Sequence, residues 1–186
     1  KRDGLHYAPI RTAGRIREDI TLHPADSRET RISLDTFRVT PEILHGLEKT
    51  VLDTCRAGDL LAFAGRNPKG LEKADVIAFL RRLIASGVRV IVDSNSFTPE
   101  DLTEIHPWLI KPNEQEIVSF LGTSVENAQD AAHAAAELVK RGVAEEVMIS
   151  LGGDGAVWSD GQDALILSVP KLAHPVSTIG AGDSTL

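Results

Sequence analysis

Hydrophobic and polar positions follow different patterns in two parts of the chain. Near the N-terminus, short apolar–polar alternations at residues 19–23 and 30–34 flank the turn-forming cluster Pro24-Ala25-Asp26-Ser27-Arg28. Two alternating runs joined by such a cluster predict a β-hairpin. We therefore expect a small β-rich portion over residues 1–36 and a different fold over residues 37–186.

From residue 40 onward, segments with helical spacing alternate with short, nearly continuous apolar runs. Thr40-Pro41-Glu42 is a favourable helix start, with a capping hydroxyl, a proline and an early acid. Further helices are predicted over Leu71–Ser86, Asn113–Leu121 and Ser124–Arg141. The apolar runs predict strands over residues 60–64, which we expect to be buried, and over 88–92, 109–111, 146–151, 155–158 and 164–169. This order predicts an α/β fold whose parallel sheet is covered on both faces.

Composition and charge narrow the class of protein. The 186 residues carry a net charge of −7 and are 42% hydrophobic, as expected of a globular protein. The acidic balance argues against a nucleic-acid partner, and no apolar stretch approaches the roughly 20 residues of a membrane span. The start of the chain shows no secretory signal, and a single cysteine, Cys55, forms no internal disulfide. We therefore expect a cytoplasmic protein.

The segment Gly180-Ala181-Gly182-Asp183 is the strongest candidate for chemistry. Its glycines let the backbone approach a ligand, and its amide N–H groups converge if a helix begins near Asp183. An anion cradle beside a carboxylate meets the needs of phosphoryl transfer to an alcohol. A simple turn with a helix cap is the alternative. The sequence contains no G-x-x-x-x-G-K-[ST] phosphate loop, which excludes a P-loop enzyme.

Two other segments follow predicted strands. In Lys111-Pro112-Asn113-Glu114-Gln115-Glu116, Asn113 and Glu116 lie on one helical face, and their oxygens suit Mg²⁺. The alternative is an N-cap with an acidic first turn. The glycine-rich turn Ser150-Leu151-Gly152-Gly153-Asp154-Gly155 could accept a nucleotide or form a simple hairpin.

In this order and spacing, the motifs TIGAGDS, KPNEQE and SLGGDGA resemble the ribokinase-like PfkB family of carbohydrate kinases. Gly14-Arg15-Ile16-Arg17 and the loop at residues 63–70 are similar to further segments of that family. The resemblance implies a three-layer α/β/α fold with a mostly parallel sheet and a small β lid within residues 1–36. Arg66, Asn67 and Asn95 depart from the family pattern on the substrate side.

The resemblance also implies roles for individual residues. Asp183 is expected to be the catalytic base, and the amides of Gly180, Ala181 and Gly182 the anion hole. Arg17 and Lys69 are expected to hold the phosphate of the substrate. Asn113 and Glu116 are expected to organise Mg²⁺ around ATP. The implied nucleotide-binding residues are Lys111, Ser150, Leu151, Gly152, Gly153, Asp154, Gly155 and Gly182.

The implied activity is ATP-dependent phosphorylation of a sugar phosphate, with fructose 1-phosphate converted to fructose 1,6-bisphosphate. Tagatose 6-phosphate, another sugar or a nucleoside are alternative substrates, and a non-catalytic nucleotide-binding module is the alternative from another class. The resemblance also suggests a homodimer formed through the lid. Because family members extend further at both ends, we expect a fragment with little activity of its own.

Overall fold

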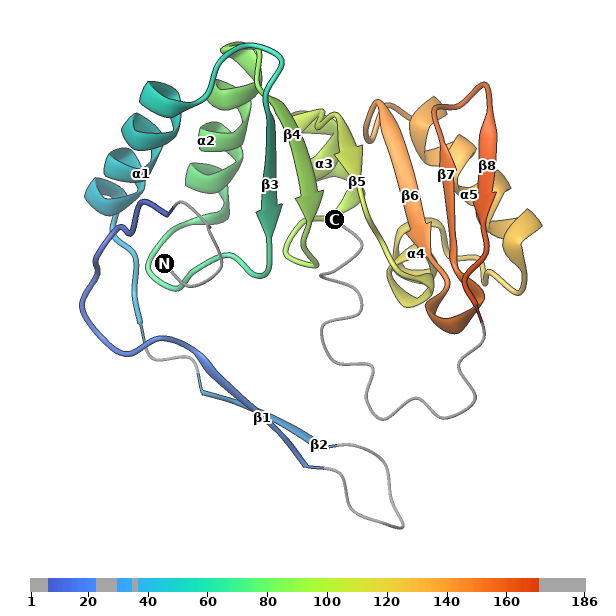
Figure 1. Cartoon of the computed structure of the whole chain (residues 1–186), viewed down its shortest axis with the longest axis horizontal. Coiled ribbons are helices and arrows are strands. Elements are labelled where there is room, and N and C mark those ends of the chain that lie inside the picture. The colour runs from blue at the N-terminus through green and yellow to red at the C-terminus, as the bar shows by residue number, and fades with distance from the viewer. Residues whose placement is uncertain (1–6, 23–29, 35–36, 171–186) are drawn as a thin grey trace.

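The computed structural model describes residues 7–22, 30–34 and 37–170, which form two separate sheets (Figure 1). Strand β1 (Glu18–Leu22) pairs antiparallel with β2 (Thr30–Leu34) in a two-stranded ribbon, with Ile20 opposite Ile32. The ribbon projects from the side of the main sheet on which β3 and β4 end (Figure 1). The predicted hairpin is therefore confirmed.

The main sheet contains six strands arranged in chain order. Neighbouring strands from β3 to β6 run parallel, whereas β7 and β8 are antiparallel to their neighbours. This confirms the prediction of a mostly parallel α/β fold. The strands are β3 (Leu60–Ala64), β4 (Arg89–Asp93), β5 (Leu109–Ile110), β6 (Glu146–Ser150), β7 (Ala156–Ser159) and β8 (Ala164–Leu167).

The described residues form five α-helices, of which four were predicted from the sequence. They are α1 (Pro41–Thr54), α2 (Lys73–Ala85), α3 (Pro99–Ile105), α4 (Glu114–Leu121) and α5 (Ala128–Lys140). The N-cap of the unpredicted helix, α3, is Thr98, whose side chain accepts a hydrogen bond from the amide of Asp101. With seven residues, α3 is too short to show a clear hydrophobic period. None of the described helices is long and apolar enough to cross a membrane.

The predicted start of α5 at Ser124 is wrong. The helix begins at Ala128, and its cap is Asn127, whose side-chain oxygen accepts from the amides of Gln129 at 2.9 Å and Asp130 at 3.0 Å. Serine and asparagine are comparable capping residues, so local sequence did not separate the two positions.

All five helices pack against one face of the main sheet. The buried core joins residues of each helix to alternate strand positions, including Val90, Val92, Ile110, Val147 and Ile149. Because side chains alternate along a strand, these residues share one face. Helix α5 packs on β6, β7 and β8, and α2 packs on β4 (Figure 1).

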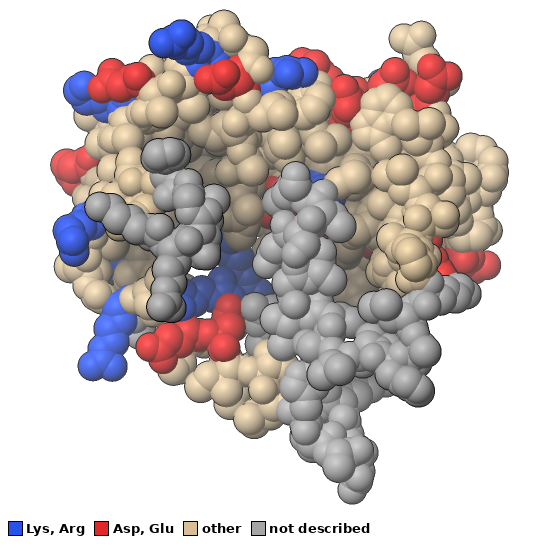
Figure 2. All heavy atoms as spheres, in the orientation of Figure 1, with Lys and Arg blue, Asp and Glu red and all other residues tan. Residues whose placement is uncertain are grey.

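The opposite face, here called the open face, is apolar and partly exposed. Its apolar residues include Leu60, Ala62, Ile91, Leu109, Met148, Trp158, Leu165 and Leu167, and the charged residues Arg89 and Glu146 share the face with them. Leu60 is 54% exposed and Leu165 57% exposed. Where the described residues of this side are visible, Figure 2 shows mostly uncharged atoms, with charged side chains at the rim and in the central hollow. The prediction that strand 60–64 is buried is therefore wrong, because β3 is an edge strand. The second covered face that we predicted is not formed by the described helices.

Candidate active site

The carboxyl ends of four parallel strands meet at one edge of the main sheet. Backbone bonds fix their order: the amide of Lys111 donates to Val92 at 3.1 Å, and the amide of Ser150 donates to Pro112 at 3.0 Å. Asn113 and Ser150 also form an isolated parallel bridge. Three of the predicted positions, Lys111, Asn113 and Ser150, therefore lie side by side, at the edge where open α/β sheets bind ligands.

Lys111 is one of the few buried charged residues, with 5% of its surface exposed. Its Nζ lies 3.1 Å from Oδ2 of Asp93, the last residue of β4. No role was predicted for Asp93 from the sequence. A signal was present, because Asp93 closes the strand that pairs with the strand before Lys111.

Asn113 and Glu116 form a reciprocal capping box at the start of α4. The amide of Asn113 donates to Glu116 Oε2 at 2.9 Å, and the amide of Glu116 donates to Asn113 Oδ1 at 2.9 Å. The cap that we considered as an alternative is therefore present, and it leaves Glu116 Oε1 outside these two bonds.

This pair still fits a magnesium ion of the kind that keeps most of its water. Mg²⁺ in nucleotide sites is held by one or two side-chain oxygens together with phosphates and waters. The part of the chain that the structure describes contains no group of three or more His, Cys, Asp and Glu side chains that could hold a metal. An ion at Asn113 and Glu116 would therefore depend on phosphate and water oxygens for its remaining ligands.

The predicted glycine-rich turn joins β6 to the antiparallel β7, so the simple hairpin is confirmed. A short 3-10 helix, η1 (Gly152–Asp154), forms its exposed tip. Gly155 has a φ of 107°, and a Cβ there would overlap the carbonyl oxygen of Leu167. A Cβ on Gly153 would meet no atom within 4 Å. Gly155 is thus required by the backbone, whereas Gly153 leaves room beside the strand ends.

The two cations predicted for the substrate side lie on the ribbon and in the loop that follows β3. The Arg17 guanidinium donates to Asp19 Oδ1 at 3.1 Å and to the Ser33 hydroxyl at 3.3 Å, so neighbours on the ribbon hold it. Lys69 lies in the loop between β3 and α2, where its carbonyl accepts from the amide of Val39 at 2.8 Å. The predicted catalytic residues Gly180, Ala181, Gly182 and Asp183 lie outside the described residues.

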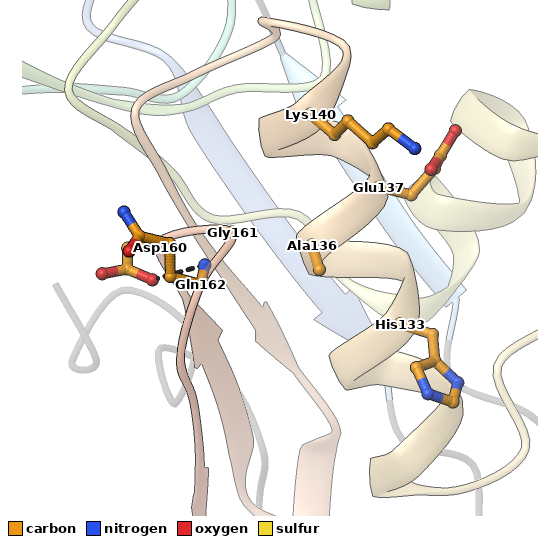
Figure 3. Close-up of a pocket in the computed structure, with 7 residues that line it drawn as sticks. All are labelled: His133, Ala136, Glu137, Lys140, Asp160, Gly161 and Gln162. Atoms are coloured by element: carbon orange, nitrogen blue, oxygen red, sulfur yellow. Dashed lines mark hydrogen bonds between the residues drawn. The ribbon is translucent and has the colours of Figure 1, made fainter.

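A wider groove on the described surface lies elsewhere. About 530 Å³ in volume, it separates α5 from the turn between β7 and β8 (Figure 3). Ser159 pairs with Val147, so this turn lies at the amino end of β6, opposite the candidate site. Asp160 Oδ1 accepts from the amides of Gln162 and Asp163, and Glu137 is paired with Arg141. These carboxylates already have protein partners. A far smaller hollow, about 10 Å³, lies beside Lys111 and Glu116.

Comparisons with known proteins agree with the fold and the motifs. The family described as pfkB family carbohydrate kinase matches residues 4–186. The chain is similar to the 1-phosphofructokinase of Haemophilus influenzae, with 27% identity over 97% of this chain and 58% of the relative. It is also similar to that of Escherichia coli K12, with 30% identity over 92% of this chain and 54% of the relative.

Solved structures give the same result. Escherichia coli phosphofructokinase-2 in complex with substrates and products superimposes with a TM-score of 0.75 at 28% identity, covering 89% of this chain and 54% of that one. The tetrameric inhibited form of the same protein gives a TM-score of 0.78 at 27% identity, over 95% of this chain and 58% of that one. The fold is that of the ribokinase-like kinases. The chain belongs to the pfkB family of carbohydrate kinases, and spans a little over half the length of these relatives.

Proposed function

We propose that this chain carries the nucleotide side of an ATP-dependent sugar-phosphate kinase, which converts fructose 1-phosphate to fructose 1,6-bisphosphate. The observation that supports this most is the register of the strand ends, which sets Lys111 and Asn113 beside Ser150. These positions belong to two of the three motifs that predicted a kinase.

Asp183 is the proposed base. In the proposed step, the 6-hydroxyl oxygen of fructose 1-phosphate attacks the γ-phosphorus of ATP and forms the new P–O bond. The bond to the bridging oxygen breaks and ADP leaves, while the hydroxyl proton passes to the Asp183 carboxylate. The amides of Gly180, Ala181 and Gly182 would stabilise the charge on the transferring group.

Asn113 and Glu116 are the proposed magnesium-binding pair. A bound Mg²⁺ would neutralise charge on the nucleotide phosphates. Lys111 would add a fixed positive charge next to them, and the turn from Ser150 to Gly155 would line the nucleotide pocket. Glu116 can serve both purposes because the capping bond uses one carboxylate oxygen and leaves the other available.

The choice of fructose 1-phosphate follows the names of the relatives, and tagatose 6-phosphate remains the second candidate. Arg17 and Lys69 are the proposed ligands of the substrate phosphate. Arg17 would have to share its guanidinium with Asp19, which it contacts at 3.1 Å. A guanidinium has five N–H donors, enough for a carboxylate and a phosphate together.

The ribbon and the rest of the chain have separate proposed roles. We assign residues 1–36 to a lid and residues 37–186 to the kinase core, because β1 and β2 pair only with each other. The lid is also the proposed contact of a homodimer. One face of the ribbon carries Ile20, Leu22, Ile32 and Leu34, each 45–49% exposed.

ADP release from the native gene product tests this function. The panel is fructose 1-phosphate, tagatose 6-phosphate, fructose 6-phosphate, ribose and a nucleoside, each with MgATP. We expect the highest kcat/KM for fructose 1-phosphate.

Asp183→Ala should lower kcat by about 10²–10⁴-fold while ATP still binds. Asp53→Ala, an exposed carboxylate on α1, is the control and should leave turnover unchanged. Preference for another substrate would overturn the substrate assignment, and an Asp183→Ala enzyme with normal turnover would overturn the mechanism.

A further inference from the structure

We propose that Asp93 is a positioning residue, which holds the Lys111 ammonium at the strand ends so that it can bind the nucleotide phosphates. The inference rests on the proposed function, because that function gives Lys111 a phosphate ligand. It is carried by the ion pair that joins the ends of β4 and β5, with Nζ and Oδ2 at 3.1 Å.

Strand register brings the two side chains together. Ile91 pairs with Leu109 and Val92 with Ile110, so Asp93 and Lys111 are the next residues on the two neighbouring strands. Side chains alternate between the two faces of a sheet, so both residues belong to the open face and not to the face that packs on the helices. Asn113 has the same parity and bridges Ser150. The pair therefore lies at the same strand ends, and on the same face of the sheet, as the proposed magnesium-binding and nucleotide-binding residues.

The burial of Lys111 argues for a purpose other than stability. The lysine is 5% exposed, and the Asp93 side chain is 20% exposed. Removing two charges from water is costly, and a buried ion pair often stabilises a fold no better than apolar residues of similar size. A lysine at this position, where β5 otherwise contributes buried Leu109 and Ile110, is better explained by the ligand it can bind.

The pair also has unused binding capacity. An ammonium has three N–H donors. Among the described residues, Asp93 is its only charged partner, through one contact of 3.1 Å between Nζ and Oδ2. The N–H groups that do not point at Asp93 can donate to phosphate oxygens without breaking the contact with Asp93. The carboxylate then fixes the direction of a long, flexible side chain, and this lowers the entropy cost of binding phosphate.

Four variants of the native gene product test the inference: Asp93→Asn, Asp93→Glu, Lys111→Met and the double variant with Asp93→Asn and Lys111→Met. We expect Asp93→Asn to lower kcat/KM for MgATP by roughly ten- to a hundredfold, as loss of a group that orients a ligand typically does. The KM for the sugar phosphate should stay unchanged. Asp93→Glu should restore most of the loss. The double variant should be no worse than Lys111→Met alone, because Asp93 acts through Lys111.

A second measurement does not require turnover. Reductive methylation followed by mass spectrometry reports how accessible each lysine is, and Lys111 should react several-fold faster in Asp93→Asn than in the wild type. Asp101→Asn is the matched control, since Asp101 pairs with Lys73 at 2.6 Å between α2 and α3. It should expose Lys73 and leave both Lys111 and the KM for ATP unchanged.

Three results would overturn the proposal. They are unchanged Lys111 labelling in Asp93→Asn, additive effects in the double variant, and an Asp93→Asn protein that loses thermal stability but keeps wild-type ATP binding. If Asp93→Asn does not fold, ATP binding by Asp93→Glu decides, and a loss as large as that of Lys111→Met would count against positioning. A wild-type protein without kinase activity would refute the proposed function instead, and labelling and ATP binding would still test the pair.

Discussion

Two glycines in the turn between β6 and β7 differ in whether the backbone requires glycine at that position. Gly155 has a positive φ and lies against the Leu167 carbonyl, whereas Gly153 has open space around it. Gly155→Ala should lower the free energy of unfolding by about 2 kcal/mol or more, because strain and overlap add. Gly153→Ala should change it by less than about 0.5 kcal/mol. Urea titration of both variants measures this, and equal losses would contradict the distinction.

If Gly153 borders the nucleotide pocket, the Gly153→Ala variant also tests ATP binding. Gly153→Ala should then weaken ATP binding while leaving the unfolding curve in place. Calorimetric titration with ATP would show whether the space beside Gly153 is used by a ligand.

Glu48 and Arg82 join α1 to α2 through a bidentate ion pair in which Glu48 is buried and Arg82 is half-exposed. Arg82 Nη2 donates to Glu48 Oε2 at 2.9 Å, and its Nε donates to Oε1. The hydrogen bonds from Arg82 hold the pKa of Glu48 below its usual value of 4.5, against the opposing effect of burial. Since a lowered pKa in the folded state favours the ionised form, the pair stabilises the fold at neutral pH and loses this effect in acid.

Glu48→Gln should therefore destabilise the protein by about 1–2 kcal/mol at neutral pH, because Arg82 is half-exposed and solvent weakens the pair. The difference from the wild type should shrink as the pH falls below about 4.5. Glu104→Gln removes an exposed ion pair with Arg81 and should cost less than about 1 kcal/mol. Thermal unfolding across pH tests both, and a Glu48→Gln deficit that grows in acid would disprove the assignment.

Among the helices and strands, α4 begins with residues that cap the helix and that are also the proposed magnesium site. Glu116→Gln keeps a side-chain oxygen that can accept from the Asn113 amide but removes the charge. We expect a loss of stability below about 1 kcal/mol and a rise of about tenfold or more in the Mg²⁺ concentration needed for half-maximal activity. Glu114→Gln is the control, since Glu114 is exposed and lies two residues before Glu116 in the same helical turn. A purely structural Glu116 would leave the Mg²⁺ requirement unchanged.

Helix starts also show where sequence patterns were and were not sufficient. Thr40-Pro41-Glu42 predicted α1, and Thr98-Pro99-Glu100 begins α3 in the same way, yet only the longer helix has enough apolar repeats to be recognised. At α5, Ser124 was the predicted cap, but the cap is Asn127, a residue type that caps helices equally well. Local chemistry marks a start but not which of two neighbouring starts is used.

For the whole molecule, the exposed apolar face of the ribbon predicts self-association. An isolated two-stranded ribbon is marginal in water, so pairing of two ribbons through Ile20 and Ile32 would stabilise both. Ile20→Lys should shift a dimer to monomer in sedimentation velocity. Thr21→Lys, on the opposite face of the same strand, is the control and should leave the dimer intact. A monomeric wild type, or dissociation by Thr21→Lys as well, would contradict the lid interface.

The sequence predicted the order of strands and helices well because each buried strand is a distinct apolar run between helical repeats. It also placed Lys111, Asn113 and Ser150 correctly at strand ends. It could not predict the partner of Lys111, since that contact depends on which strands are neighbours. Nor could it predict the exposure of Leu60, because an edge strand and a central strand share the same apolar composition.

The open face of the main sheet, which none of the described helices covers, has a practical consequence for work with this polypeptide. Leu60 on β3 and Leu165 and Leu167 on β8 face solvent on the two edge strands, and such side chains adsorb apolar dyes, plastic surfaces and partly unfolded chains. Recovery from a gel-filtration column should therefore fall as the loaded concentration rises, and 8-anilinonaphthalene-1-sulfonate should fluoresce with the native protein. Leu165→Lys, at the centre of β8, should reduce both effects without touching the candidate site.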